Sequence, residues 1–262
     1  METVLDESKD LKRRPNVVVV LIDDMGFSAP SSFGGPCRMP TSERLAVNGI
    51  RYTRFHPTGI CPPTRASLLT GRNHHAVGMG YVTDMATPEP GYCARIPDSA
   101  GTIPQVLRGA GYTSGAFGKM HETPRDEISP VGPFDRWPTR GLGFDRFYGF
   151  MGGEMNQWYP ALYDGTAAIT QPKLPKDGYH FSEDIVDRAI SWISDVKSLT
   201  RQPFFCYLPF GATHAPFHVP PGWAERYRGM FDHGWDEQRE RTLARQKEMG
   251  IVPEDTVLAP WA

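Results

Sequence analysis

The sequence predicts an α/β fold in which a mainly parallel sheet is sandwiched by helices, and three observations support this prediction. Short apolar runs alternate with helical patterns along most of the 262 residues, as in proteins built from strand–helix–strand units. The first run, residues 16–22, is continuously apolar and β-branched, which is typical of a strand buried on both faces. Polar residues directly follow several predicted strands, where open α/β sheets place their sites.

The first part of the chain predicts two strands with a helix between them. Residues 16–22 (NVVVVLI) form the first strand. Residues 40–48 form a short helix that begins at a Thr41 or Ser42 cap and ends near a glycine. Residues 50–55 (IRYTRF) alternate between apolar and polar side chains, so they predict the second strand.

The middle of the chain continues the alternation. Residues 64–70 predict a helix that stops at a glycine, and residues 102–110 predict another that closes at a pair of glycines. Residues 112–117 (YTSGAF) then predict a strand, and residues 144–150 form a weaker strand candidate. This order of elements favours crossover connections between parallel strands.

The last part of the chain changes character after one more helix and strand. Residues 182–199 start at a serine cap and carry an apolar stripe at helical spacing, and residues 204–210 (FFCYLPF) predict an apolar strand. From residue 223 to residue 262 the chain is rich in charge and poor in apolar residues. We expect exposed helices there, with ion pairs one helical turn apart such as Glu237 with Arg241.

The composition excludes several function classes. Lys plus Arg is 28 and Asp plus Glu is 30, so the formal net charge is −2, and we expect no nucleic-acid partner because such binders are usually basic. No apolar run approaches the ~20 residues of a transmembrane helix, so we expect no membrane partner. Residues 1–15 predict a polar arm without the apolar core of a secretory signal, which favours a cytoplasmic location and reduced thiols for the four cysteines. Nothing in the sequence indicates an oligomeric state.

Polar side chains follow three of the predicted strands. Asp23 and Asp24 end the first strand, Lys119 and His121 follow the strand 112–117, and His214 follows the strand 204–210. Two adjacent carboxylates concentrate negative charge that a hard cation such as Ca²⁺ or Mg²⁺ would neutralise. An exposed turn is the alternative for the acid pair, because a glycine follows closely. The buried strand before the pair favours the metal.

The segment around Cys61 is the most specific signal in the chain. Residues 61–71 read CPPTRASLLTG. One interpretation is a proline-stiffened loop with an incidental thiol. Another is a reactive cysteine whose thiol pKa is lowered by Arg65, as a cysteine hydrolase would need. A metal site built from this cysteine through a CxxC pair is not available, since no such pair exists.

This segment resembles the signature of the type I sulfatases, C-x-P-S/T-R followed by x-x-L-L-T-G. In that family the cysteine is converted after translation to formylglycine, which is the nucleophile. Cys61, Pro63 and Arg65 match the core that the formylglycine-generating enzyme reads, and Thr64 stands where serine is commoner. The resemblance therefore implies a partner enzyme during maturation and a modified Cys61.

Further motifs resemble the same family in the same order along the chain. They are the strand followed by two aspartates, G-K-M-H at residues 118–121 and T-H-A-P at residues 213–216. The run GRNHHAVGMG after the signature is similar to a bacterial arylsulfatase subgroup. The resemblance implies an alkaline-phosphatase-like sulfatase fold, with residues 16–222 as the N-terminal part of the catalytic domain and residues 223–262 as a charged helical segment.

The resemblance also implies a role for each site residue. The modified Cys61 would attack the sulfur of a small-molecule sulfate ester, and Ca²⁺, or else Mg²⁺, would be held by Asp23, Asp24 and Cys61. The catalytic set would be completed by the residues that hold the nucleophile, contact the sulfate and move protons, namely Arg65, Lys119, His121 and His214.

The resemblance implies a longer chain than this one. The family completes its metal site with a later Asp-Asn or Asp-Gln pair and adds a second lysine, and no such pair follows His214. We therefore expect a fold that is incomplete at the C-terminus, with little turnover by itself. Two alternatives to arylsulfatase-type hydrolysis stay open: a phosphate or phosphonate ester hydrolase of the same superfamily, and an inactive remnant that binds anions.

Overall fold

The computed structural model describes residues 14–260 and divides them into two compact units. Unit 1 comprises residues 14–24 and 57–218, and unit 2 comprises residues 25–56 and 219–260. The predicted polar arm falls almost entirely outside the described residues. No helix among the described residues is long and apolar enough to cross a membrane.

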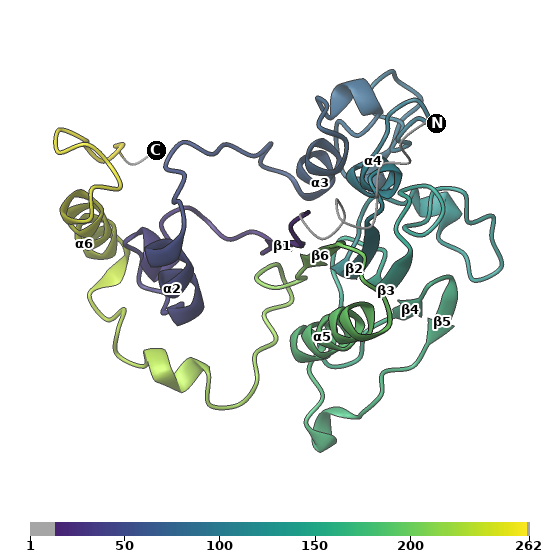
Figure 1. Ribbon diagram of the computed structural model, residues 1–262. Helices are drawn as coiled ribbons and strands as arrows, with labels where there is room; N and C mark the ends of the chain where they lie inside the picture. The colour runs from purple at the N-terminus through teal and green to yellow at the C-terminus, as the bar shows by residue number, and fades with distance from the viewer. Residues whose placement is uncertain (1–13, 261–262) are drawn as a thin grey trace, which may run out of the picture. The chain divides into compact units, whose positions relative to one another are not determined.

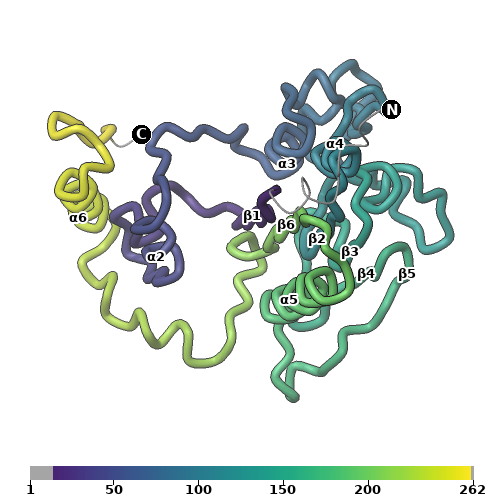
Figure 2. Tube along the Cα trace, in the orientation of Figure 1, coloured from purple at the N-terminus to yellow at the C-terminus, as the bar shows by residue number. Residues whose placement is uncertain are grey.

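Unit 1 is built on a six-stranded sheet in the order β1-β6-β2-β3-β4-β5 (Figure 1). The first four strands in this order are parallel, and β4 and β5 add an antiparallel hairpin at one edge. The strands are β1 (Val17–Leu21), β2 (Thr113–Lys119), β3 (Arg146–Phe150), β4 (Leu162–Asp164), β5 (Ala167–Ile169) and β6 (Phe204–Pro209). The parallel sheet predicted from the sequence is confirmed. Figure 2 shows β1 and β6, the first and last strands along the chain, side by side.

Helices cover both faces of this sheet. The helices of unit 1 are α3 (Cys61–Thr70), α4 (Ile103–Gly109) and α5 (Phe181–Leu199), with short 3-10 turns at η2 (His75–Val77), η3 (Thr83–Met85), η4 (Arg125–Glu127) and η5 (Pro175–Asp177). Helix α5 packs on one face and α3 and α4 on the other (Figure 1). Strand β2 sends alternate side chains into the two cores, Phe117 toward α5 and Ala116 toward α3 and α4. The predicted sandwich is therefore confirmed.

Unit 2 is helical in the residues that the structure describes. It contains η1 (Ser31–Phe33), α2 (Pro40–Asn48), η6 (Ala224–Tyr227) and α6 (Gly234–Glu248). The predicted charged helix is confirmed as α6, and Arg241 pairs with Glu237 one turn away. The strand predicted at residues 50–55 is wrong: this segment has no strand partner, and Ile50, Tyr52 and Phe55 are exposed. Alternation alone could not reveal that no neighbouring strand satisfies its backbone groups.

Two further sequence predictions are wrong in detail. Strand β1, at an edge of the described sheet, is not buried on both faces, because Val18 and Val20 on one face are 51% and 53% exposed. The predicted helix caps also differ. Helix α2 starts at Pro40, a residue whose fixed backbone suits a first helical position, and α5 is capped by the His180 ring, which accepts from the Ser182 amide at 3.2 Å.

Candidate active site

The polar residues that follow the parallel strands of unit 1 meet at the carboxyl ends of those strands. Asp23 follows β1, and the segment that carries His214 follows β6, the strand paired with β1. Two backbone hydrogen bonds fasten these segments together: the Asp23 amide donates to the carbonyl of Ala212 at 3.0 Å, and the Thr213 amide donates to the carbonyl of Asp23 at 2.7 Å. Parallel pairing therefore fixes two of the predicted site segments against each other.

A buried cluster of three charges forms the centre of the site. The Asp23 carboxylate accepts a hydrogen bond from Arg65 at 3.1 Å through one oxygen and pairs with the Lys119 ammonium through the other. Arg65 also donates to the backbone carbonyl of Lys119 at 2.7 Å. These three residues are 5%, 1% and 0% exposed. Burial would raise the pKa of Asp23, but the two cations outweigh it and hold that pKa below its usual value.

Cys61 is the first residue of α3 and is half-buried beside this cluster. Pro62 and Pro63 follow it, and proline is favoured in the first turn of a helix because no amide hydrogen bond is lost there. Burial raises the pKa of the Cys61 thiol, although the Lys119 charge acts in the opposite direction. The thiol is therefore neutral near pH 7. This argues against the cysteine-hydrolase interpretation, which requires a thiolate.

Cys61 also lies within reach of both predicted metal ligands. One ligand atom from each of Asp23, Asp24 and Cys61 lies within 4.8 Å of the others, and no other such group occurs in the part of the chain that the structure describes. Asp24 is exposed and adopts a left-handed backbone, with φ of 55°. Two carboxylates suit a hard cation, whereas a thiol sulfur does not. An oxygen in place of that sulfur would make the three donors uniformly hard.

The two predicted catalytic histidines differ in environment. His121 is 3% exposed, and neither of its ring nitrogens has a hydrogen-bond partner in the structure. Burial, together with the Lys119 and Arg65 charges, lowers the pKa of His121 to about 3, so its ring is neutral. His214 is half-buried; its Nε2 lies 3.8 Å from an Asp24 carboxylate oxygen, and its Nδ1 lies 2.8 Å from the carbonyl of Ala215.

The buried His121 predicts a loss of stability in mild acid. Its pKa is about 3 in the folded chain and about 6.5 when unfolded, so the unfolded state binds more protons between these values. Stability should therefore fall as the pH drops below about 6.5, with a slope that approaches 1.4 kcal/mol per pH unit. His121→Gln should remove this component. Urea unfolding at a series of pH values measures this dependence. If the free energy of unfolding changes with pH equally in the unaltered protein and in His121→Gln between pH 6.5 and 4, the prediction is wrong.

Two buried ionisable residues beside Arg65 were not predicted from the sequence. Glu122 is 2% exposed, neither of its carboxylate oxygens has a hydrogen-bond partner in the structure, and burial raises its pKa well above the usual value. Tyr207 in β6 is also fully buried, and its pKa is raised to about 12, chiefly by burial. Glu122 directly follows His121 in the sequence, and this adjacency was the one available signal.

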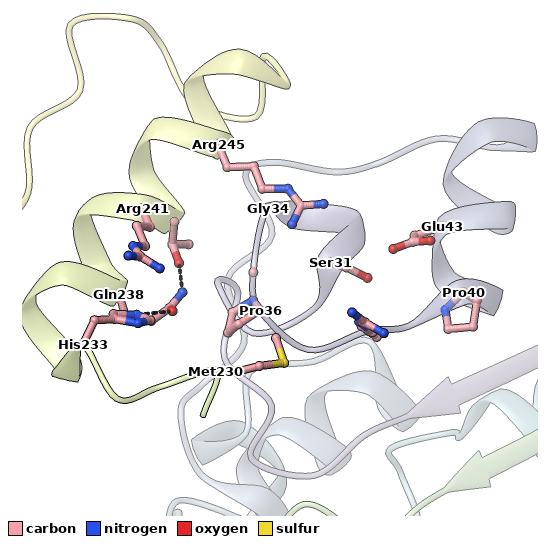
Figure 3. Close-up of a pocket in the computed structure, with 13 residues that line it drawn as sticks. Ser31, Gly34, Pro36, Pro40, Glu43, Met230, His233, Gln238, Arg241 and Arg245 are labelled. Atoms are coloured by element: carbon pink, nitrogen blue, oxygen red, sulfur yellow. Dashed lines mark hydrogen bonds between the residues drawn. The ribbon is translucent and has the colours of Figure 1, made fainter. Parts of the chain in front are cut away.

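Unit 2 contains a pocket of about 590 Å³ that none of the predicted site residues lines. Figure 3 shows Ser31, Gly34 and Glu43 from the first segment of this unit facing Gln238, Arg241 and Arg245 from α6. The pocket is open and carries charges of both signs. Its lining includes none of the charged residues of the cluster around Cys61.

A family model described as Sulfatase matches residues 15–252. An uncharacterised sulfatase of Schizosaccharomyces pombe is 31% identical over 95% of this chain and 46% of its own length. An arylsulfatase of Klebsiella aerogenes is 31% identical over 94% of this chain and 53% of its own. The chain therefore spans about half the length of these curated relatives.

Solved sulfatase structures have the same fold. A sulfatase from a Pseudoalteromonas species superposes with a TM-score of 0.63 at 19% identity, covering 93% of this chain and 53% of its own. A putative sulfatase from Bacteroides fragilis gives a TM-score of 0.62 at 19% identity, covering 90% and 59%. Because the family model covers most of the chain and the sheet and its site segments have the expected order, this protein belongs to the sulfatase family and has its alkaline-phosphatase-like fold.

Proposed function

We propose that this chain carries the nucleophile side of an arylsulfatase-type active site, which hydrolyses small-molecule sulfate esters through a formylglycine at position 61 and a divalent cation. The observation that supports this most is the environment of Cys61. Its thiol is neutral and half-buried, beside a fully buried Lys119 and Arg65 and two carboxylates. A neutral thiol is a weak nucleophile, but the same position suits an oxygen nucleophile next to cations that neutralise a sulfate group.

The modification and the cation would supply the chemistry that the encoded residues lack. A hydrated formylglycine supplies one hydroxyl that attacks sulfur and a second that later releases the sulfate. Ca²⁺, or alternatively Mg²⁺, would be held by Asp23, Asp24 and the oxygen at position 61, and would lower the pKa of the attacking hydroxyl. Conversion of Cys61 would be carried out by a formylglycine-generating enzyme, the partner that this proposal requires.

The residues of the chain then have separate tasks. Lys119 and Arg65 neutralise the sulfate oxygens, because both are charged, buried and fixed by Asp23. His214 protonates the leaving phenol or alcohol oxygen, since it is the more exposed histidine and lies beside Asp24. His121 is neutral and accepts a proton from the second hydroxyl, and the negative sulfate formed next to it would raise its pKa during the reaction.

The choice between sulfate and phosphate esters is tested by paired substrates. Protein purified from its native host should release sulfate from an aryl sulfate faster than it releases phosphate from the matched aryl phosphate. Turnover should be slow, because only three ligand positions for the cation occur in the described residues. Cys61→Ala supplies the blank for both esters. Faster release of phosphate would favour the phosphate ester hydrolase, and binding of both anions without release would favour the anion-binding remnant.

The proposed cation site predicts a calcium-dependent stabilisation. A ligand that binds only the folded state raises stability by RT ln(1 + [L]/Kd), so Ca²⁺ should raise the thermal midpoint in a concentration-dependent way. Asp24→Asn should weaken this response, because Asp24 is an exposed ligand outside the buried charge cluster. Asp187→Asn, which removes an exposed carboxylate from α5, is the matched control and should respond like the unaltered protein. An equal response in all three proteins would contradict this site.

A further inference from the structure

The orientation of the His121 ring is set by packing. The residue is 3% exposed, and neither ring nitrogen has a hydrogen-bond partner in the structure. Its backbone is left-handed, with φ of 54°, so the ring leaves the end of β2 in a direction that regular strand geometry would not give. Neighbouring atoms must therefore hold the ring in place.

Gly153 is one of the neighbours that hold it. This residue lies in the loop after β3, and a Cβ atom added to it would stand 2.6 Å from Cε1 of His121, 3.0 Å from Nε2 and 3.3 Å from Nδ1. Carbon atoms in contact lie about 3.5–4.0 Å apart, so a side chain at Gly153 would occupy space that the imidazole now fills. The backbone of Gly153 is outside the range that favours glycine, so close approach to the ring is what excludes a side chain there.

The adjacent glycine provides a direct comparison. A Cβ added to Gly152 would meet only the backbone oxygen of Glu154, at 3.8 Å, which is an ordinary contact. Its backbone also accepts other residues, as that of Gly153 does. The two positions therefore differ in one respect: a side chain at Gly153 collides with His121, and a side chain at Gly152 does not.

We propose that Gly153 is a positioning residue: because it has no side chain, it leaves the space that the His121 ring occupies. Any other residue at position 153 pushes the ring out of its present direction, because the ring is the movable partner in the collision and no hydrogen bond retains it. The claim that Gly153 positions the His121 ring rests only on the distances between them. Its consequence for catalysis rests on the proposed function of His121.

Histidine NMR measures the ring directly. In protein labelled at histidine Cε1, the His121 resonance is assigned by its absence in His121→Gln. Gly153→Ala should shift this resonance, and Gly152→Ala should leave it in place. An unshifted His121 resonance in Gly153→Ala would overturn the positioning.

A double variant keeps the test decisive if Gly153→Ala unfolds. Removing the ring removes the collision, so His121→Ala combined with Gly153→Ala should be as stable as His121→Ala alone. If the second substitution destabilises the protein equally with and without the ring, Gly153 does not act through His121.

Turnover separates this inference from the proposed function. In protein that carries the modified Cys61, Gly153→Ala should lower kcat for an aryl sulfate on the order of 100-fold with little change in KM, as misplacement of a reacting group does. Gly152→Ala should keep the original kcat. If the His121 resonance shifts and kcat does not change, the positioning by Gly153 holds and the assignment of His121 to proton transfer is wrong.

Discussion

Replacing Asp23 by alanine should lower the free energy of unfolding by about 3–5 kcal/mol, the cost of removing one partner from a buried ion pair. The carboxylate binds Arg65 through one oxygen and Lys119 through the other, and all three side chains are buried. Without Asp23, two cations remain in a site with little access to water. Urea unfolding at pH 7 in the absence of divalent cations measures the change.

The neighbouring residue is the matched control for this prediction. Asp24 carries the same charge one position later, but its side chain is 57% exposed, and the ion pairs with Arg65 and Lys119 are made by Asp23. Asp24→Asn removes the charge and keeps a residue type that tolerates the left-handed backbone at this position, so it should change stability by no more than about 0.5 kcal/mol. If both variants lose the same free energy of unfolding, Asp23 does not act through its ion pairs with Arg65 and Lys119.

Replacing Gly118 by alanine should cost about 2–6 kcal/mol, from backbone strain and a steric collision together. Gly118 is the residue before Lys119 in β2, and its φ is 136°, a conformation that residues with a side chain rarely adopt. A Cβ at this position would stand 1.9 Å from the carbonyl oxygen of Pro209 in β6. Because that oxygen belongs to the backbone of a central strand, it cannot move aside cheaply.

A glycine outside the sheet shows what the same substitution does without these constraints. Gly109 lies in α4, and an added Cβ would meet nothing within 4 Å. Gly109→Ala should stabilise the chain by about 0.5–1 kcal/mol, because alanine is the better helix former and loses less backbone entropy on folding. Thermal unfolding of both variants tests the pair, and a stable Gly118→Ala protein would contradict the tight approach of β2 and β6.

The sequence was sufficient to predict the three strands that carry the site residues. Strands β1 and β6 are short apolar runs, and β2 combines small and apolar residues; Asp23 and His214 follow β1 and β6 within a few residues, and Lys119 is the last residue of β2. Since parallel strands end at the same edge of a sheet, Asp23, Lys119 and His214 had to converge. The helix after this segment was predicted from residue 64, whereas it starts at Cys61, because the two prolines that suggested a loop occupy its first turn.

Other features depended on contacts that no local pattern records. The segment 50–55 alternates like a strand, but a strand needs a partner, and the described residues provide none. The exposed face of β1 at Val18 and Val20 depends on whether another element packs on that face of the sheet. The hairpin of β4 and β5 has strands of three residues each, too short to show a period.

Within the site, the sequence predicted the types of residue but not how they act on one another. The pairing of Asp23 with both Arg65 and Lys119 joins residues far apart in the chain. It gives the fully buried Lys119 a carboxylate partner. The contact between Gly153 and His121 is equally non-local. Such contacts are set by the packing of whole elements, which periodicity and motif spacing do not describe.

The central claim is that Cys61 is the precursor of an oxygen nucleophile, and mass spectrometry of the protein from its native host tests this most directly. Trypsin releases residues 55–65 as one peptide, because Arg54 and Arg65 flank it. We expect a mass in which the thiol sulfur of Cys61 is replaced by an aldehyde oxygen, while the peptides that contain Cys37, Cys93 and Cys206 keep their sulfur. An unmodified thiol at Cys61 in protein from that host would contradict the proposed mechanism.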